Sequence, residues 1–335
     1  MAERAAIQRV KDAYKEEILS KPHVVGVGTG YKISKGVRTS EMCIVTLVRQ
    51  KMPVDGLSPK AIVSKQYDGI LTDVIEVGDV RALQTPTSRW RPAPGGVSIG
   101  HYKITAGTLG AVVRDRASGD RLILSNNHVL ANSNDAAVGD PILQPGPTDG
   151  GSTSSDVIAH LERFHPIDFS QEPGTCSLAN SFAELGNAIA SAMGAKHRVQ
   201  AIYANPQAAN LVDGAVARPV SDNDIKDEIL NIGVVSGTME ATLGMSVRKS
   251  GRTTGFTTGE ITVLDATVNV SYGTGRVARF DNQIVTGPMS QGGDSGSLVV
   301  AGDALKAIGL LFAGSDQTTI INPIQAVLDS LSITI

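Results

Sequence analysis

The sequence has few cysteines and no long apolar runs. It has two cysteines, Cys43 and Cys176, which fall in what we interpret as different domains, so no disulfide framework is expected. It has no run of about 18 apolar residues, which argues against a membrane-spanning helix. Residues 1–10 contain no long apolar stretch, which argues against a Sec-type signal. A cytoplasmic protein with reduced thiols is therefore expected.

A strong excess of charge of either sign is also missing. The formal net charge is −3, and 19% of the residues are charged. The chain thus has neither the basic surface that nucleic-acid binding requires nor a polybasic patch for a membrane, and we expect neither as a partner. Aromatic residues make up only 4% of the chain, but the hydrophobic fraction of 41% is enough for a full core. A length of 335 residues suggests two domains.

Residues 1–83 have the pattern of a small α/β domain. Apolar residues at helical spacing predict an amphipathic helix over 2–19, and Pro22 follows as a stop. The next patterns predict two strands, a short helix and a third strand, over residues 24–31, 42–48, 57–63 and 71–77. This part contains no catalytic constellation, so we interpret it as a regulatory or assembly domain. Its removal should then change activity or oligomeric state.

The rest of the chain has a different pattern. Residues 84–96 contain three prolines and end in two glycines, which predicts a linker. Over residues 97–335, short β-branched segments recur between turn residues, as is typical of an all-β barrel or sandwich. Apolar spacing predicts an inserted helix over 177–194, which could serve as a lid, an exosite or an oligomer contact. A second helix is expected from Pro323 to Leu331.

Ser295 lies in the most suggestive motif, between glycines and directly after Asp294. Glycines allow turn geometry that exposes a serine hydroxyl and aligns the neighbouring N–H groups, although a plain β-turn uses the same residue types. A serine nucleophile needs a base. Of the six histidines, only His128 lies in a turn directly after a strand-like segment.

A buried carboxylate is then needed to orient the imidazole. Asp213 fits best, because it interrupts an otherwise apolar strand, where an unpaired carboxylate would be costly. Asp140 and Asp168 are weaker candidates. Asp140 precedes a proline and is more typical of a turn.

In the order His, Asp, Ser, three motifs resemble those of trypsin-like (chymotrypsin-fold) serine peptidases: residues 124–130, 212–215 and 292–297. The resemblance is to single-chain bacterial members and, distantly, to the plant Narrow Leaf-type trypsin-like proteins. It implies a mainly β fold, with two six-stranded antiparallel barrels over residues 97–335. His128 and Asp213 would come from the first barrel and Ser295 from the second.

The resemblance also implies an activity, that of a serine endopeptidase acting on a protein or peptide through an acyl-enzyme. The backbone N–H groups of Gly293 and Ser295 would form the oxyanion hole. The substrate would be met by Met289, Ser290, Phe312, Ala313 and Gly314, the last three pairing with its backbone. Neither Met289 nor Ser290 is acidic, so a preference for Arg or Lys is not expected. No cofactor and no metal are implied, and a homo-oligomer is an open alternative to a monomer.

The sequence also departs from the pattern of peptidases that are activated by cleavage. It shows no activation cleavage site followed by an Ile-Val start, so Asp294 is not expected to pair with a newly freed N-terminus. Two other functional classes stay open: a peptidase-fold protein that binds peptides with little turnover, and an acyl hydrolase that acts on non-peptide substrates.

Three further patterns have plainer explanations. The spacing of Gly26, Gly28 and Gly30 suggests a dinucleotide loop, but no helix is expected to follow, so glycines in a strand are favoured. Residues 252–259 could bind an anion, but a threonine-rich hairpin is favoured. His160, His165 and Cys176 lack a standard zinc spacing and a fourth ligand.

Overall fold

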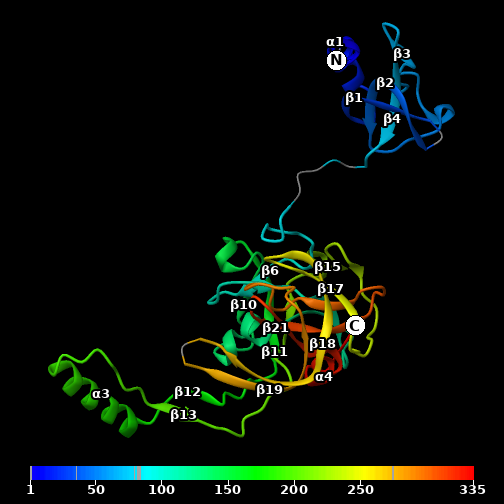
Figure 1. Ribbon diagram of the computed structural model, residues 1–335. Helices are drawn as coiled ribbons and strands as arrows, with labels where there is room; N and C mark the ends of the chain where they lie inside the picture. The colour runs from blue at the N-terminus through cyan, green and yellow to red at the C-terminus, as the bar shows by residue number, and fades with distance from the viewer. Residues whose placement is uncertain (1, 35, 79, 81–83, 274) are drawn as a thin grey trace. The chain divides into compact units, whose positions relative to one another are not determined.

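The computed structural model describes residues 2–34, 36–78, 80, 84–273 and 275–335 (Figure 1). The chain divides into two compact units, residues 1–83 and residues 84–335. Each unit has its own sheets and its own hydrophobic core.

The first unit packs one helix against one four-stranded sheet. Helix α1 (Ala2–Leu19) buries Ile7 and Ile18 against this sheet, whose order is β1-β2-β4-β3. Strands β1 and β2 are antiparallel, whereas β2 and β4 are parallel. The strands are β1 (Val24–Ser34), β2 (Val37–Val48), β3 (Gln66–Tyr67) and β4 (Ile70–Glu76).

Two expectations for this unit have different outcomes. The three glycines lie within strand β1, where the side chain of Val45 leaves no room for a Cβ at Gly30, so the strand interpretation is confirmed. The short helix expected over 57–63 is not formed. A 3₁₀ turn, η1 (Val54–Gly56), is followed by irregular turns, because Pro59 disfavours helical geometry at the residue before it.

The segment 84–96, expected to be a linker, belongs to the second unit. The N–H of Trp90 donates to Gln144 Oε1 at 2.8 Å, and the Arg91 guanidinium donates to the same oxygen at 2.7 Å. Strand β5 (Ala93–Gly95) is buried and pairs in parallel with β15 (Ile225–Ile229). The boundary between the units therefore falls before Gln84 rather than after this segment.

The first barrel-like sheet of the second unit has the order β23-β8-β9-β14-β11-β10-β6-β7. Its strands are β6 (Ser98–His101), β7 (Gly107–Thr108), β8 (Ala111–Asp115), β9 (Arg121–Ser125), β10 (Pro141–Leu143), β11 (Val157–Phe164), β14 (Ala215–Pro219) and β23 (Ile333–Thr334). A small sheet of order β16-β15-β5 adds β16 (Gly233–Val234). The short helical turns are α2 (Asn127–Leu130), η2 (Asn132–Asn134), η3 (Pro147–Asp149) and η4 (Asp222–Asp224).

The second barrel closes on itself. Its sheet has the order β13-β12-β19-β18-β17-β20-β21-β22, and β22 also pairs with β19, so strands β17 to β22 form a ring. These strands are β17 (Ser246–Gly251), β18 (Gly255–Ser271), β19 (Val277–Thr286), β20 (Leu298–Ala301), β21 (Ala307–Gly314) and β22 (Thr319–Pro323). Helix α4 (Ile324–Ser330) then returns the chain to the first sheet, where β23 pairs with β8. The expected mainly β fold with two barrel-like units is confirmed.

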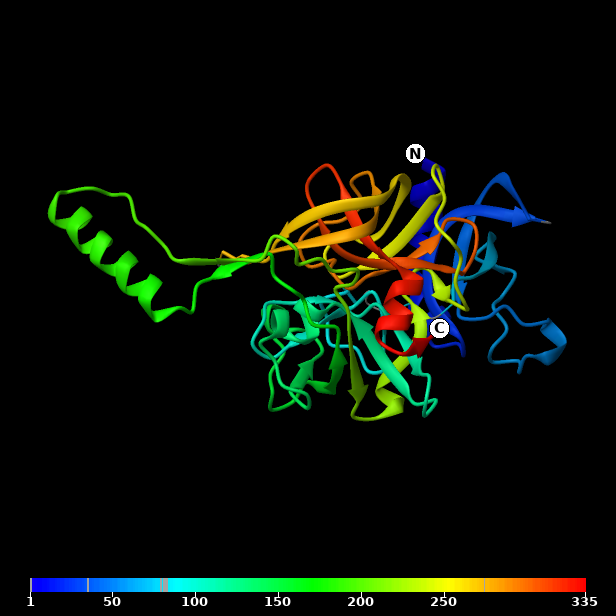
Figure 2. The same cartoon turned by 90° about the horizontal axis from the view of Figure 1, so that it is seen from below.

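An arm extends from the barrels of the second unit (Figures 1 and 2). It consists of β12 (Gln171–Pro173), helix α3 (Ser177–Ala192) and β13 (Ile202–Ala204), and β12 joins the second barrel by pairing with the start of β19. The predicted inserted helix is therefore present, but its apolar side chains are mostly exposed. Among the residues described, no helix is long and apolar enough to cross a membrane.

Candidate active site

His128 is held where strand β9 turns into the short helix α2. Val129 and Leu130 are buried and return the chain to the core, whereas the His128 side chain keeps 23% of its surface exposed. Asn126 donates its side-chain amide to the carbonyl of Asp213 at 2.7 Å, and this bond fixes the turn against the next member of the site. A strand end followed by two asparagines thus places an imidazole at the edge of the first barrel.

Asp213 lies just before β14, and its carboxylate is fully buried. Its Oδ2 lies 2.6 Å from His128 Nδ1, and its Oδ1 accepts the backbone N–H of His128 at 3.2 Å. The Asp213 N–H in turn donates to Asn322 Oδ1 at 3.0 Å. Because Nδ1 is engaged by the carboxylate, the ring is oriented with Nε2 left for the cleft.

A tyrosine that the sequence did not single out also contacts this carboxylate. Tyr272, directly after β18, donates its hydroxyl to Asp213 Oδ2 at 2.8 Å. Burial, the negative charge of Asp213 and the hydrogen bond to it raise the pKa of the Tyr272 phenol well above its usual value, so the phenol stays a donor. No sequence motif marks Tyr272, since it is an isolated aromatic residue at a strand end.

The loop that carries Ser295 requires both of its flanking glycines. Gly293 and Gly296 have φ angles of +96° and +94°, which residues with a Cβ rarely adopt. A Cβ would lie 2.5 Å from Thr253 Oγ1 at position 293, and 2.1 Å from Ser125 Oγ at position 296. The loop therefore has a specific conformation and packs closely against residues of both barrels, unlike an ordinary surface turn.

The same loop presents two N–H groups that have no partner among the residues described. Within the described part of the chain, neither the Gly293 N–H nor the Ser295 N–H donates a hydrogen bond, although Asp294 N–H donates to Gln291 O and Gly296 N–H to Leu311 O. Buried or half-buried N–H groups are normally paired, so two neighbouring free donors suit an incoming anionic oxygen. They are the donors expected to form the oxyanion hole.

Ser295 and His128 line one cleft of about 660 Å³. The Ser295 hydroxyl donates to the carbonyl of Phe312 at 3.4 Å, and no hydrogen bond joins it to the His128 ring among the described residues. A bond of that length is weak, so little holds the hydroxyl in this rotamer. Catalytic hydrogen bonds are often loose before substrate is bound.

Asp294 is buried beside the nucleophile and is paired from several sides. Lys249 Nζ lies 3.1 Å from its Oδ2, Thr254 Oγ1 donates to the same oxygen at 2.6 Å, and the N–H groups of Thr253 and Thr254 donate to Oδ1. Burial alone would raise the pKa of Asp294, but the Thr254 hydroxyl, the Lys249 charge and the backbone donors hold it below the usual value. Strands β17 and β18 pair antiparallel up to Gly251 and Gly255, so the hairpin favoured for residues 252–259 is confirmed, and the N–H groups of its turn donate to an internal carboxylate.

The structure separates the expected substrate-binding residues. Ser290, Phe312, Ala313 and Gly314 line the cleft, and Ser290 Oγ lies 2.8 Å from Thr319 Oγ1. Met289 is not among the lining residues. It is only 3% exposed and packs in the core of the second barrel, because its side chain fills the space above Gly259. Phe312 also turns its ring into a core cluster, so its backbone faces the cleft.

The weaker candidates lie elsewhere. Asp140 pairs with the fully buried His101 at 3.0 Å, and Asp168 donates its N–H to Asn210. In the part of the chain that is described, no group of three or more His, Cys, Asp or Glu side chains is arranged to hold a metal.

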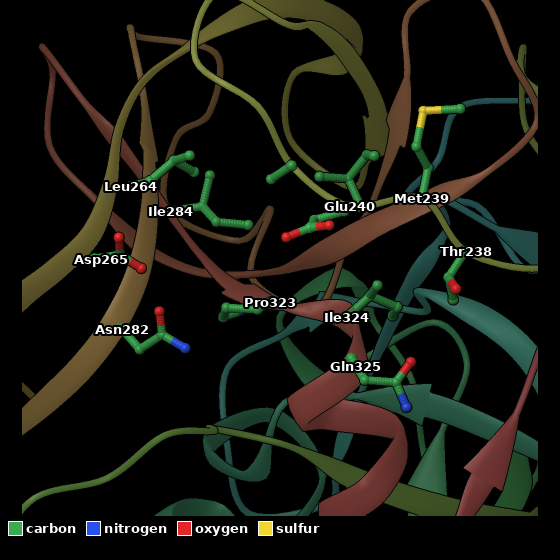
Figure 3. A pocket seen from close by; sticks show the side chains of 12 residues that line it. Thr238, Met239, Glu240, Leu264, Asp265, Asn282, Ile284, Pro323, Ile324 and Gln325 are labelled. Atoms are coloured by element: carbon green, nitrogen blue, oxygen red, sulfur yellow. The ribbon is translucent and has the colours of Figure 1, made fainter.

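A second hollow, of about 560 Å³, lies between the β18–β19 hairpin and the start of α4 (Figure 3). It contains none of the three residues of the expected triad.

The fold and the site define a chymotrypsin-type arrangement, with a serine on one barrel and a histidine–aspartate pair on the other. The chain is 35% identical to Streptogrisin-D from Streptomyces griseus over 130 residues, which cover 37% of this chain and 28% of that protein. It is 40% identical to Serine protease 2 from Streptomyces fradiae over 81 residues, 24% of this chain and 43% of that protein. The resemblance to trypsin-like serine peptidases is thereby confirmed, and the link to the plant proteins stays a prediction.

The extent of these matches is limited. The chain spans less than half of the length of either curated relative, and no family model matches it. Among solved structures, the Nocardiopsis protease NAPase is similar at a TM-score of 0.46 and 19% identity, over 72% of this chain and 97% of that one.

Proposed function

We propose that this chain is a serine endopeptidase that cleaves peptide bonds through a Ser295–His128–Asp213 triad. The single observation that carries the proposal is the 2.6 Å contact between Asp213 Oδ2 and His128 Nδ1 at the edge of the cleft that also contains Ser295. A buried carboxylate that orients an imidazole beside a glycine-flanked serine is the arrangement that activates a hydroxyl for acyl transfer.

The proposed reaction has two halves. Ser295 Oγ attacks the peptide carbonyl as His128 Nε2 takes its proton, and Asp213 stabilises the resulting imidazolium. The Gly293 and Ser295 N–H groups bind the oxyanion, and His128 then protonates the leaving amine. A water activated by the same histidine hydrolyses the acyl-enzyme in the second half.

The cleft also suggests how substrate is held. The main chain of residues 312–314, at the end of β21, lines the cleft and would pair with the substrate backbone as an added strand. Of the two positions expected to set specificity, Met289 is buried and Ser290 presents a neutral hydroxyl to the cleft. Apart from His128, Asp316 is the only charged side chain among the described residues that line the cleft. We therefore infer that the residue before the cleaved bond is uncharged.

The test is a comparison of the parent with Ser295→Ala. The parent should react with a fluorophosphonate probe and cleave members of a peptide library after uncharged residues. Ser295→Ala should lose the labelling and about 10⁶-fold in kcat, as expected when a nucleophile is removed. Ser118→Ala, in an exposed turn, serves as the matched control. Equal labelling of the parent and of Ser295→Ala would contradict the proposal.

One observation favours a second candidate, a protein that holds a peptide in this cleft with little turnover. The Ser295 hydroxyl contacts the Phe312 carbonyl instead of His128. This candidate expects peptide binding by the parent without labelling. A non-peptide acyl hydrolase would instead label but would cleave esters far faster than amides.

A further inference from the structure

Tyr272 reaches the triad from the opposite barrel. It follows β18 at the tip of the β18–β19 hairpin, where its N–H donates to Arg276 O at 3.0 Å and the Arg276 N–H donates to Gly273 O at 2.9 Å. The hairpin belongs to the second barrel, which carries Ser295, whereas Asp213 lies beside β14 of the first. The Tyr272–Asp213 hydrogen bond therefore links the two halves of the site.

Tyr272 and Arg276, the two residues that flank the turn of this hairpin, both contact the first barrel or the segment that follows it. The Tyr272 ring meets the His128 ring edge-on, with centroids 5.9 Å apart, and meets Phe169 in the same way at 5.7 Å. Arg276 lies over Phe169 and forms a forked ion pair with Asp135 at 2.8 and 3.2 Å. These contacts of Tyr272 and Arg276 hold the phenol in place beside Asp213.

The partners of Asp213 explain why a neutral donor is useful there. Among the residues that the structure describes, no lysine or arginine forms an ion pair with this buried carboxylate. Oδ2 is shared by the imidazole and the phenol, and within the described ranges Oδ1 accepts only a backbone N–H. A phenol stabilises the ionised carboxylate and fixes its rotation, but it adds no positive charge that would compete with the imidazolium.

We propose that Tyr272 is a positioning residue, whose hydroxyl holds the Asp213 carboxylate in the orientation that aligns His128 with Ser295. The role rests on the proposed peptidase function for its effect on rate, but the effect on His128 itself does not require turnover. The phenol acts through Asp213 and contacts neither the attacked carbonyl nor the leaving group.

The test uses Tyr272→Phe in the full chain, with Tyr203→Phe as the matched control in the exposed strand β13. Tyr272→Phe keeps the ring and removes only the hydroxyl. We expect kcat to fall about 10- to 100-fold with KM nearly unchanged, the size of one hydrogen bond to a charged group. The acid limb of the pH–rate profile should move to higher pH, because more of the charge of Asp213 then faces the imidazolium.

A second readout is independent of turnover. The NMR resonance of the His128 Nδ1 proton should shift and exchange faster in Tyr272→Phe, and stay as in the parent in Tyr203→Phe. If this resonance changes while the parent fails to label with fluorophosphonate, the peptidase proposal fails and the positioning role stands. If rate, pH profile and resonance all match Tyr203→Phe, the positioning role is overturned.

A second variant covers the case in which Tyr272→Phe does not fold. Asp135→Asn removes the ion pair that anchors Arg276 and leaves the phenol in place. We expect Asp135→Asn to change the His128 Nδ1 proton resonance and the acid limb of the pH–rate profile in the same direction as Tyr272→Phe, but by less. Parent-like behaviour in both would also overturn the proposal.

Discussion

Two buried aspartates, one from each barrel, flank the proposed catalytic groups and have very different hydrogen-bond partners. Asp213 and Asp294 are both fully removed from solvent. Asp294 pairs with the Lys249 ammonium, whose pKa burial lowers, and it accepts further hydrogen bonds from Thr253, Thr254 and Gln291. Among the described residues, Asp213 is paired only with neutral donors and with the His128 imidazole, which the proposed reaction would charge.

Under the proposed mechanism, this difference separates a structural carboxylate, Asp294, from a catalytic one, Asp213. A carboxylate that is already neutralised by a lysine has little left to offer a new positive charge. A carboxylate that is buried without a permanent cation gains most when the imidazolium forms beside it. Asp294 is therefore suited to holding the nucleophile loop, and Asp213 to stabilising a charge that appears during reaction.

Asp213→Asn should give the largest effect. An amide would donate to His128 Nδ1 and turn the ring to the wrong tautomer, so kcat should fall about 10⁴-fold. The free energy of unfolding should fall by about 1–3 kcal/mol, because the amide keeps an oxygen for the His128 N–H but loses the acceptor that the imidazole and the Tyr272 hydroxyl share. Steady-state kinetics and denaturant unfolding measure the two quantities.

Asp140→Asn is the control for this variant, since Asp140 also pairs with a buried histidine, His101, away from the cleft. A loss of less than tenfold in kcat for Asp213→Asn would contradict the proposal that Asp213 stabilises the charge formed on His128 during reaction.

Lys249→Met should give the second-largest effect, and this effect should be a loss of unfolding free energy. It leaves the Asp294 carboxylate buried without its cation, which typically costs about 3–5 kcal/mol of unfolding free energy. Denaturant unfolding of the full chain measures this loss. Lys226→Met is the matched control, because Lys226 forms a single exposed pair with Glu228 and should cost less than about 1 kcal/mol. Equal losses in the two variants would mean that Lys249 does not stabilise the loop through Asp294.

The sequence was sufficient to single out the proposed triad, because its members lie in local motifs. His128, Asp213 and Ser295 were predicted because each interrupts its surroundings in a readable way: a histidine in a turn after a strand, a carboxylate in an apolar segment, a serine between glycines. The mainly β fold class was predicted from short β-branched segments between turn residues. Both the spacing of apolar residues and the turn residues are local properties of the sequence.

Groups that act over long separations could not be predicted in this way. Tyr272 meets Asp213 across 59 residues of sequence, and Lys249 meets Asp294 across 45. Neither residue has neighbours that mark it, because its partner is set by how the barrels close. Met289 shows the same limit, since its distance from Ser295 along the chain does not say which way its side chain turns.

Amphipathic periodicity has a related limit. It predicted both α1 and α3, yet α1 buries Ile7 and Ile18, whereas Leu178 and Phe182 of α3 are 67% and 70% exposed. The pattern predicts which face of a helix is apolar. It does not say what covers that face, because that depends on where the connecting strands carry the helix.

Thr254→Val should give the smallest effect and tests the pH dependence of the Asp294 site. The Thr254 hydroxyl is one of the donors that hold the pKa of Asp294 below its ordinary value of 3.8. Such a carboxylate contributes stability above its unfolded pKa, and this contribution is lost as the pH falls through the lower, folded pKa. Removing the donor raises the folded pKa, so acid unfolding should begin at higher pH, with a loss of about 1–3 kcal/mol at pH 7.

Thr267→Val is the matched control for the acid titration. Its hydroxyl donates to the carboxylate of Asp281 at 2.9 Å on the outer part of the β18–β19 hairpin, where both residues reach solvent. Solvent can replace a donor there but not at Asp294, so Thr267→Val should leave the acid midpoint close to that of the parent. If both variants move the midpoint equally, burial is not what distinguishes Asp294, and the contrast with Asp213 must rest on Lys249 alone.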